Sequence, residues 1–294
     1  MSDKYQDLIA KSKVTTDDAA VAAAVERILA EHLDENRNKD VYKLLFNTID
    51  LTTLKTTDSP ASVARFTERV NAFEEEYPEL LPVAGICVYP NFAPVVRTVL
   101  DVSGVDVVCV SGCFPSSQSF TEVKIAETAL AVEGGADEID IVLNVGNFLD
   151  GDYQEVCDEF TEQKHACRDA RLKIILETGA LATAKNIRDA AILAVNCEAD
   201  FIKTSTGKEY PGASLEAAYV MCQVIKEYYE QTGRMVGFKA AGGVATTEDA
   251  VKYYTLVKEI LGEEWLNKDR FRLGASRLAN NLLSDIIDKQ VKFF

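Results

Sequence analysis

The chain has 294 residues, 47% hydrophobic and 27% charged, which is the composition of a globular protein with a sizeable core. No apolar run approaches the roughly 20 residues that a membrane-spanning helix needs. The formal net charge of −16 argues against nucleic acid or an anionic membrane as a partner, so an anionic substrate would need a local basic pocket on an acidic body.

Cysteine and histidine usage narrows the chemistry further. The seven cysteines are odd in number and include no Cys-x-x-Cys pair, which argues against a disulfide framework. The first residues also lack a signal-peptide pattern, so we expect a reducing, cytoplasmic environment. The two histidines, His32 and His165, are too few for a multi-histidine metal centre or a serine–histidine triad. Acid–base chemistry must therefore rest on carboxylates, lysines and water, and we expect no metal.

The N-terminal part is predicted to be a helical extension. Residues 1–13 are polar and are expected to be loose, and Thr16 or Asp17 can cap a following helix. The apolar residues on one face of that helix are Val21, Val25, Ile28, Leu29 and Leu33. We expect residues 1–40 to pack on a body formed by residues 41–294, where covering the closed end of a barrel is one arrangement.

The rest of the chain repeats one unit, an apolar β-type run followed by a small-residue turn and an amphipathic helix. The predicted strands are Leu44–Leu51, Pro82–Tyr89, Val105–Ser111, Glu138–Asn144, Leu172–Thr178, Asp200–Ser205, Met235–Ala240 and Arg270–Gly274. The predicted helices include Ser59–Glu76, Glu122–Gly134, Tyr153–Arg168, Ala184–Asn196, Leu215–Thr232 and Thr247–Leu261. Eight alternating units predict an α/β fold, a (β/α)8 TIM barrel. An open doubly wound sheet is the alternative, but no Gly-x-Gly-x-x-Gly follows the first strand.

Two of the predicted strands carry a lysine near their ends. Lys203 closes one apolar run and Lys239 closes the next, and each runs into a small-residue turn. Neighbouring strands lie about 4.8 Å apart, so the ammonium groups could approach to roughly 5 Å. Their repulsion would be about 3 kcal/mol, or roughly two pKa units, which would leave one lysine as a neutral, nucleophilic amine. This predicts Schiff-base chemistry on a carbonyl. The alternative is a pair of lysines that only aid solubility.

The fourth predicted strand adds a carboxylate to this pair. Because strand side chains alternate, Ile139, Ile141 and Leu143 are expected to face the surrounding helices. The residues expected to point inward are Glu138, Asp140, Val142 and Asn144. An inward aspartate is costly without a partner, and the two lysines are the obvious partners. A purely structural salt bridge is the alternative.

The loops after the last strands suggest a phosphate site. A helix starts at about Ser276, and a helix N-terminus offers free N–H groups to an anion. Gly242-Gly243 allows close backbone approach, in the loops where barrels often bind phosphate. Lys208 and Arg277 could add charge. Gly207-Lys208 is not a Walker motif, and plain helix caps are the alternative.

The motifs together resemble those of the deoxyribose-phosphate aldolase family, from about Asp50 to Ser276. They are Asp50-Leu51-Thr52-Thr53-Leu54, Ala136-Asp137-Glu138-Ile139-Asp140, Phe201-Ile202-Lys203-Thr204-Ser205-Thr206-Gly207 and Gly237-Phe238-Lys239-Ala240-Ala241-Gly242-Gly243. The resemblance implies a class I aldolase that cleaves 2-deoxy-D-ribose 5-phosphate to D-glyceraldehyde 3-phosphate and acetaldehyde without metal or other cofactor.

The same resemblance assigns roles to individual residues. Lys203 would form the Schiff base, Lys239 would lower its pKa, and Asp140 with a bound water would move protons. Asp50 would lie near a substrate hydroxyl. The expected substrate and phosphate-binding residues are Gly207, Lys208, Gly242, Gly243, Gly274, Ser276 and Arg277.

Three features depart from the family pattern. Arg277 stands where many members have a second serine, and its guanidinium could bind phosphate or point to solvent; we expect the second. Residues 292–294 end Lys-Phe-Phe, without the tyrosine that some members bring to the site. Residues 112–117 read Gly-Cys-Phe-Pro-Ser-Ser, with an extra cysteine inside the usual Gly-Phe-Pro.

Two rival functions stay open at this point. A non-catalytic barrel that binds a phosphate-bearing ligand would keep the glycine loops but would not need two lysines and an inward aspartate. A metal-dependent aldolase or hydrolase is disfavoured by the scarcity of histidine. The expected partner is a small phosphosugar, with a homo-oligomer as a further option.

Overall fold

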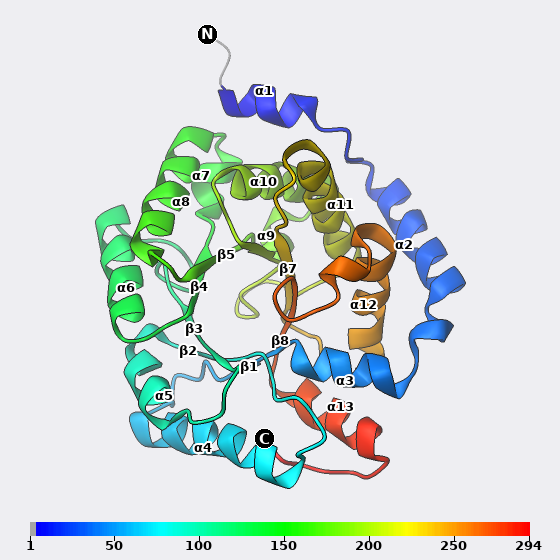
Figure 1. Ribbon diagram of the computed structural model, residues 1–294. Helices are drawn as coiled ribbons and strands as arrows, with labels where there is room; N and C mark the ends of the chain where they lie inside the picture. The colour runs from blue at the N-terminus through cyan, green and yellow to red at the C-terminus, as the bar shows by residue number, and fades with distance from the viewer. Residues whose placement is uncertain (1–3) are drawn as a thin grey trace.

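The computed structural model describes residues 4–294, which form a closed barrel of eight parallel strands surrounded by helices (Figure 1). Each strand pairs with the next along the chain, and β8 closes the barrel on β1. The strands are β1 (Ile49–Thr52), β2 (Gly85–Val88), β3 (Asp106–Val110), β4 (Glu138–Val142), β5 (Arg171–Ile175), β6 (Phe201–Lys203), β7 (Gly237–Ala241) and β8 (Phe271–Ala275). The predicted TIM barrel is therefore confirmed.

Helices alternate with these strands and surround the barrel, and three of them precede β1. They are α1 (Lys4–Lys11), α2 (Asp18–His32), α3 (Lys39–Asn47), α4 (Pro60–Glu76), α5 (Ala93–Val99), α6 (Thr121–Glu133), α7 (Val145–Leu149), α8 (Tyr153–Cys167), α9 (Thr178–Leu181), α10 (Ala184–Asn196), α11 (Leu215–Thr232), α12 (Thr247–Leu261) and α13 (Arg277–Ile287). Short 3-10 turns cover Asp34–Asn36, Pro90–Phe92 and Glu263–Trp265. Within residues 4–294, none of the helices has the length and apolar character to cross a membrane.

The first predicted strand was wrong over its first half. Residues 44–47 belong to α3, and β1 begins only at Ile49. The Asn38 side chain accepts the N–H of Val41 and caps α3, which buries Val41, Leu45 and Phe46 on one face. A short apolar run does not by itself distinguish a buried helix end from a strand, and here the two elements are almost continuous.

The N-terminal helices lie on the flank of the barrel. Asp17 caps α2 as predicted, since its side chain accepts the N–H groups of Ala19 and Ala20. The helix packs against α11 and α12, so it does not cover the closed end of the barrel (Figure 1).

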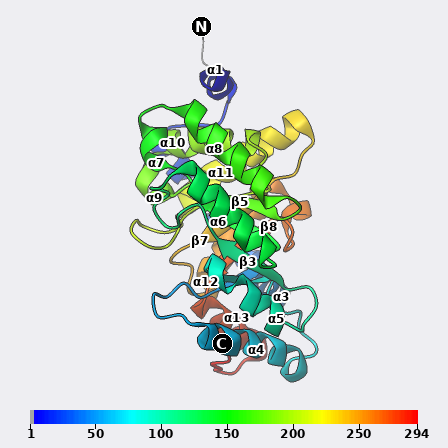
Figure 2. The ribbon, with the colours of Figure 1, turned by 90° about the vertical axis from the view of Figure 1, so that its left-hand side faces the viewer.

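Residues 4–11, which were expected to be loose, form α1 because Tyr5, Leu8 and Ile9 share one helical face against the core. The remaining residues of that prediction, 1–3, lie outside the described residues. Figure 2 shows α1 at the end of the molecule opposite the C-terminus.

Strand alternation separates an apolar outer layer from a charged interior. Ile139, Ile141 and Leu143 lie in the core between β4 and the helices, as expected from their parity. Glu138 and Asp140 point the other way, into the barrel, and both are fully buried. The barrel interior is therefore the place to look for chemistry.

Candidate active site

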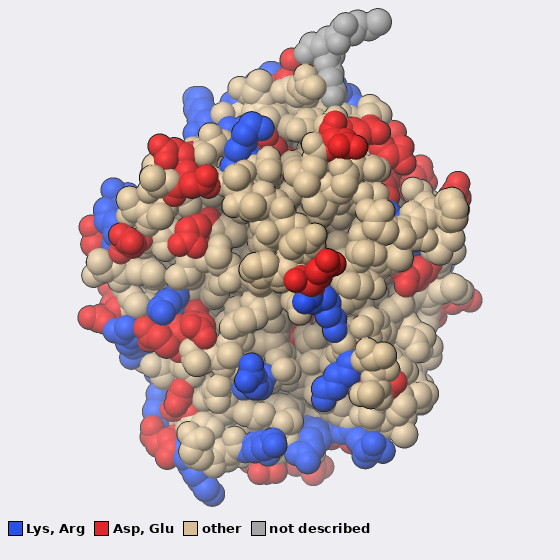
Figure 3. Space-filling view, turned by 180° about the vertical axis from the view of Figure 1, so that it is seen from behind, with Lys and Arg blue, Asp and Glu red and all other residues tan. Residues whose placement is uncertain are grey.

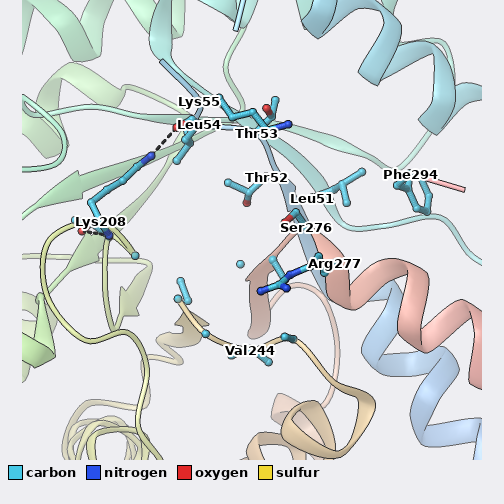
Figure 4. A pocket seen from close by; sticks show the side chains of 18 of the residues that line it. Leu51, Thr52, Thr53, Leu54, Lys55, Lys208, Val244, Ser276, Arg277 and Phe294 are labelled. Atoms are coloured by element: carbon cyan, nitrogen blue, oxygen red, sulfur yellow. Dashed lines mark hydrogen bonds between the residues drawn. The ribbon is translucent and has the colours of Figure 1, made fainter. Parts of the chain in front are cut away.

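The site lies at the C-terminal ends of the strands, where the loops surround a cavity of about 560 Å³ (Figure 4). Of the residues proposed from the sequence, those lining the cavity are Lys203, Gly207, Lys208, Gly242, Gly243, Gly274, Ser276 and Arg277. Asp50, Asp140 and Lys239 lie beneath it, fully buried in the barrel. The structure thus brings all the proposed site residues to one end of the barrel.

Lys203 and Lys239 share a single carboxylate. The register of β6 and β7 places the two lysines side by side. Lys203 Nζ donates to Asp140 Oδ2 at 2.8 Å, and Lys239 Nζ donates to the same oxygen at 2.7 Å. Lys203 is only 3% exposed but reaches the cavity, whereas Lys239 is fully enclosed. Of these two lysines, Lys203 is therefore the one that a ligand in the cavity can reach.

The two lysines differ in their pKa. Burial lowers the pKa of Lys203, and the neighbouring Lys239 lowers it further, against the pull of Asp140. Burial also opposes the charge of Lys239, but Asp140 and Asp50 outweigh it and raise the pKa of that lysine. Repulsion between the lysines is therefore a contributor to the lowered pKa, and burial is the larger cause. The accessible lysine is the one that loses its proton more readily.

A wider charge network surrounds this trio, and sequence reasoning missed two of its members. Lys173 Nζ donates to Asp140 Oδ1 at 3.1 Å and also to Glu138. Arg272 donates to Asp50 and, at 3.0 Å, to Glu138. Both cations stand inside apolar strands, so the alternation rule that singled out Asp140 would also have found them.

The network also fixes the charge of its carboxylates. Burial alone would raise the pKa of Asp140, but Lys173, Lys203 and Lys239 hold it well below the usual range. Asp50 behaves in the same way beside Lys239 and Arg272, so its pKa is lowered as well. Both carboxylates are therefore ionised at neutral pH and hold their lysines in place.

The glycines of the cavity allow close backbone approach. Gly207, Gly242 and Gly243 all have positive φ, at 73°, 83° and 85°, where a side chain would be strained. A Cβ added at Gly242 would also meet Gly212 Cα at 2.9 Å and Gly207 Cα at 3.2 Å. The loops after β6 and β7 can touch here only because glycine occupies these positions.

Two cations of the cavity wall, Lys208 and Arg277, make different contacts. Lys208 donates its Nζ to the Leu54 carbonyl and so ties the loop after β6 to the loop after β1 (Figure 4). Arg277, at the start of α13, lines the cavity and is exposed, so the expectation that its guanidinium points to solvent stays a prediction (Figure 4). Ser276 precedes α13, and its hydroxyl makes no capping hydrogen bond within the helix.

The C-terminal segment also lines the cavity, which sequence reasoning did not foresee. Asn280 Oδ1 accepts the N–H groups of Phe293 at 2.6 Å and Phe294 at 3.0 Å. Both rings pack against an aromatic cluster that includes Phe73. Lys292 and Phe294 therefore form part of the cavity wall.

The face that carries these loops is locally basic. In Figure 2 the loops after β1 and β6 project to the left of the barrel. Seen from that side, Lys and Arg side chains stand around the middle and lower edge of the molecule (Figure 3). Cations among the cavity-lining residues include Lys55, Lys208, Arg277 and Lys292. An acidic protein thus presents a positive entrance to an anionic ligand.

One cluster among residues 4–294 has ligand atoms close enough for a metal ion, formed by His32, Glu35 and Glu259. It lies on α2, the following 3-10 turn and α12, and none of its residues lines the cavity. Glu35 already accepts from Lys258 Nζ at 2.8 Å. The cluster therefore has no part in the site described above.

Comparison with known proteins gives one consistent family. Residues 48–258 match the model of the DeoC/LacD family aldolases. A Caenorhabditis elegans protein with the provisional name deoxyribose-phosphate aldolase is 41% identical over 92% of this chain and 89% of that protein. The deoxyribose-phosphate aldolase of Mus musculus is 38% identical over 95% of this chain and 90% of its own. A crystal structure from Coccidioides immitis, provisionally named as the same enzyme, superimposes with a TM-score of 0.68 at 28% identity, over 91% of this chain and 98% of that one.

Proposed function

Because the chain belongs to the DeoC/LacD family of aldolases, we propose that it is a class I aldolase acting on 2-deoxy-D-ribose 5-phosphate. The products are D-glyceraldehyde 3-phosphate and acetaldehyde, and the reaction is reversible. The observation that carries the proposal is Lys203, a buried lysine with a lowered pKa that reaches the cavity and is paired with Asp140. A small phosphosugar is the partner that this chemistry requires.

The first step makes the Schiff base. The neutral Nζ of Lys203 attacks the aldehyde carbon of the open-chain sugar, and the carbinolamine loses water to give an iminium ion. Asp140 takes and returns protons through a bound water, since its carboxylate faces Lys203 at 2.8 Å. Lys239 keeps its charge beside Asp140 and so holds this carboxylate in its ionised form.

The second step breaks the carbon–carbon bond. The C3 hydroxyl loses its proton to Asp140 through the bound water, the C2–C3 bond breaks, and its electron pair moves into the iminium to give a two-carbon enamine on Lys203. Glyceraldehyde 3-phosphate leaves with its new carbonyl at the former C3 of the sugar. Protonation of the enamine and hydrolysis then release acetaldehyde and the free lysine. Asp50, held by Lys239 and Arg272, supplies negative charge near the substrate hydroxyls.

The substrate phosphate is assigned to the loops after β6, β7 and β8. Gly207, Gly242 and Gly243 leave room for the dianion against the backbone. Ser276 lines the cavity directly before α13, and a helix N-terminus favours negative charge. Arg277 and Lys208 add positive charge at the rim. Gly274 also lines the cavity, and a Cβ there would lie only 2.9 Å from Ala241 Cβ.

The decisive experiment is reductive trapping. With acetaldehyde and borohydride, the protein should gain the mass of one ethyl group, and peptide mapping should place it on Lys203. Prior treatment with a chelator should leave trapping and turnover unchanged. A non-catalytic barrel that binds phosphate would show no added mass, and a label on Lys239 or Lys208 would contradict the assignment of the nucleophile.

Three further expectations from the sequence stay predictions. A cytoplasmic location agrees with seven cysteines that are all free. A homo-oligomer and the division of the chain at residue 40 need a solution measurement and a truncation, respectively. Size-exclusion chromatography with light scattering would give the oligomeric state directly.

A further inference from the structure

Glu177 has an unusual backbone at the edge of the site. It lies two residues after the end of β5, directly precedes α9, and adopts a left-handed conformation with φ 56° and ψ 60°. That conformation is disfavoured for a residue with a Cβ and is often found where a functional group must be held in one orientation. The side chain is only 4% exposed, so it lies inside the protein beside the loop after β6.

The carboxylate of Glu177 binds one residue of that loop twice. Its Oε1 accepts the Thr206 N–H at 3.2 Å, and its Oε2 accepts the Thr206 hydroxyl at 2.5 Å. The Thr206 Oγ1 in turn accepts the backbone N–H of Lys208 at 3.3 Å. Both donors of Thr206 are thus used on Glu177, and the direction of its hydroxyl is fixed.

The loop held in this way forms the cavity wall. Thr206, Gly207 and Lys208 all line the cavity, and Gly207 has the positive φ that turns the chain there. Thr204, two residues before Thr206, is also held by the segment that follows β5, because the Thr178 N–H donates to the Thr204 carbonyl at 2.9 Å. On its other side the loop rests on Gly242. The position of Gly207 and Lys208 therefore depends on Thr206, and that of Thr206 on Glu177.

We propose that Glu177 is a positioning residue for the substrate phosphate, acting through Thr206 on the Gly207–Lys208 backbone; this rests on the proposed aldolase function. An ionised carboxylate suits the role, because both of its oxygens accept hydrogen bonds. An amide has one oxygen only, so the second bond would have to reverse, with the amide N–H donating to the Thr206 hydroxyl, and the hydroxyl would lose its fixed direction. Burial raises the pKa of Glu177, while the bonds from Thr206 lower it.

The test separates phosphate binding from chemistry. Glu177→Gln should raise the KM for 2-deoxyribose 5-phosphate by about tenfold or more, with kcat changed less than about threefold. The kcat/KM for unphosphorylated 2-deoxyribose should not change. Thr206→Val should show the same split, Thr206→Ser should restore the wild-type KM, and the Glu177→Gln/Thr206→Val double variant should be no worse than Thr206→Val alone.

Glu198 supplies a matched control. It is also a glutamate with positive φ, at 64°, but it lies exposed in the turn after α10. Glu198→Gln should leave every constant unchanged. A Glu177→Gln enzyme with wild-type KM, or with equal losses on both sugars, would overturn the proposal.

Two checks keep the experiment decisive. If Glu177→Gln does not fold, the KM values of Thr206→Val and Thr206→Ser decide the question. These two variants differ in the Thr206 hydroxyl, which is the proposed link between Glu177 and the loop. Reductive trapping of the wild-type protein is measured first, so that a failure of the aldolase assignment is seen separately from a failure of this inference.

Discussion

Two sites in this protein bury a lysine against a carboxylate, and they differ in what surrounds the pair. Between α6 and α8, Lys124 Nζ donates to Glu159 at 2.6 Å and to Ser117 at 3.0 Å. In the barrel, Lys203 donates to Asp140, which it shares with another cation. Lys124 is enclosed by packed helices, whereas Lys203 reaches the cavity. A buried lysine thus indicates chemistry when a cavity reaches it.

The electrostatics of the two sites differ in the same way. Between α6 and α8, Lys124 is the one cation and Glu159 the one anion of the cluster. Glu159 also accepts hydrogen bonds from Ser117 and Gln163. In the barrel, three lysines and Arg272 meet Asp50, Glu138 and Asp140, so each charge depends on several partners. Such a network can hold one lysine less firmly protonated than its neighbours. The following changes probe this contrast.

Lys203→Leu should have the largest effect, because it removes the only lysine of the trio that lines the cavity. We expect turnover to fall by more than roughly 10,000-fold and reductive trapping to vanish, with the fold intact. Enzyme assay, mass spectrometry and circular dichroism measure the three outcomes. Lys124→Met is the counterpart and should keep trapping on Lys203. Residual trapping in Lys203→Leu would show that another amine is the nucleophile.

Lys239→Leu should lower activity by about 100-fold or more and also change its pH dependence. The reactive form of Lys203 is the neutral amine, so the rate rises as pH increases through the pKa of that lysine. Removing Lys239 removes one cause of the lowered pKa and leaves Asp140 to raise it, so the profile should move to higher pH. A profile that does not move would show that burial alone lowers the pKa of Lys203.

Substitutions at the Lys124–Glu159 pair should change the free energy of unfolding instead of the activity. Lys124→Met leaves Glu159 buried without its cation, and we expect a loss of about 3–5 kcal/mol in the free energy of unfolding. Lys124→Met/Glu159→Leu removes both charges and should recover most of that loss. Urea unfolding measures both variants. If the double variant is as unstable as the single one, hydrogen bonds to Ser117 and Gln163 matter more than the charges.

The sequence predicts the fold well where local signals are strong. The helix ranges Ala184–Asn196, Leu215–Thr232 and Thr247–Leu261 agree with the structure, because Thr183, Ser214 and Thr246 cap them. Residues 44–47 were misplaced because apolar content alone does not separate helix from strand.

The site was predictable to a similar degree. Lys203, Lys239 and Asp140 stood out as charges in apolar strands. Lys173 and Arg272 obey the same rule, but apolar residues follow each of them in its strand, so neither closes an apolar run, and they were missed. The docking of residues 292–294 could not be predicted, because it depends on side-chain hydrogen bonds to Asn280 and on packing against Phe73, which is distant in the sequence.

Arg277→Ser should have the smallest effect. It compares Lys203, which is proposed to bond to the substrate carbon, with Arg277, which could bind only the phosphate. Arg277 lines the cavity at the start of α13 and is exposed. A charge-assisted contact of about 1.5–3 kcal/mol corresponds to a KM for 2-deoxyribose 5-phosphate that is roughly 10- to 100-fold higher. Because solvent screens the charge of an exposed guanidinium, we expect the increase in KM to be near the lower value, about tenfold.

The same variant should leave kcat/KM for unphosphorylated 2-deoxyribose unchanged, because a phosphate contact has no partner there. Arg27→Ser, on the exposed face of α2, controls for the loss of one positive charge anywhere on an acidic protein. Raising the salt concentration should shrink the difference between wild type and Arg277→Ser, since the guanidinium is open to solvent. A KM that moves less than about threefold would mean that the loop backbone and Ser276 bind the phosphate without Arg277.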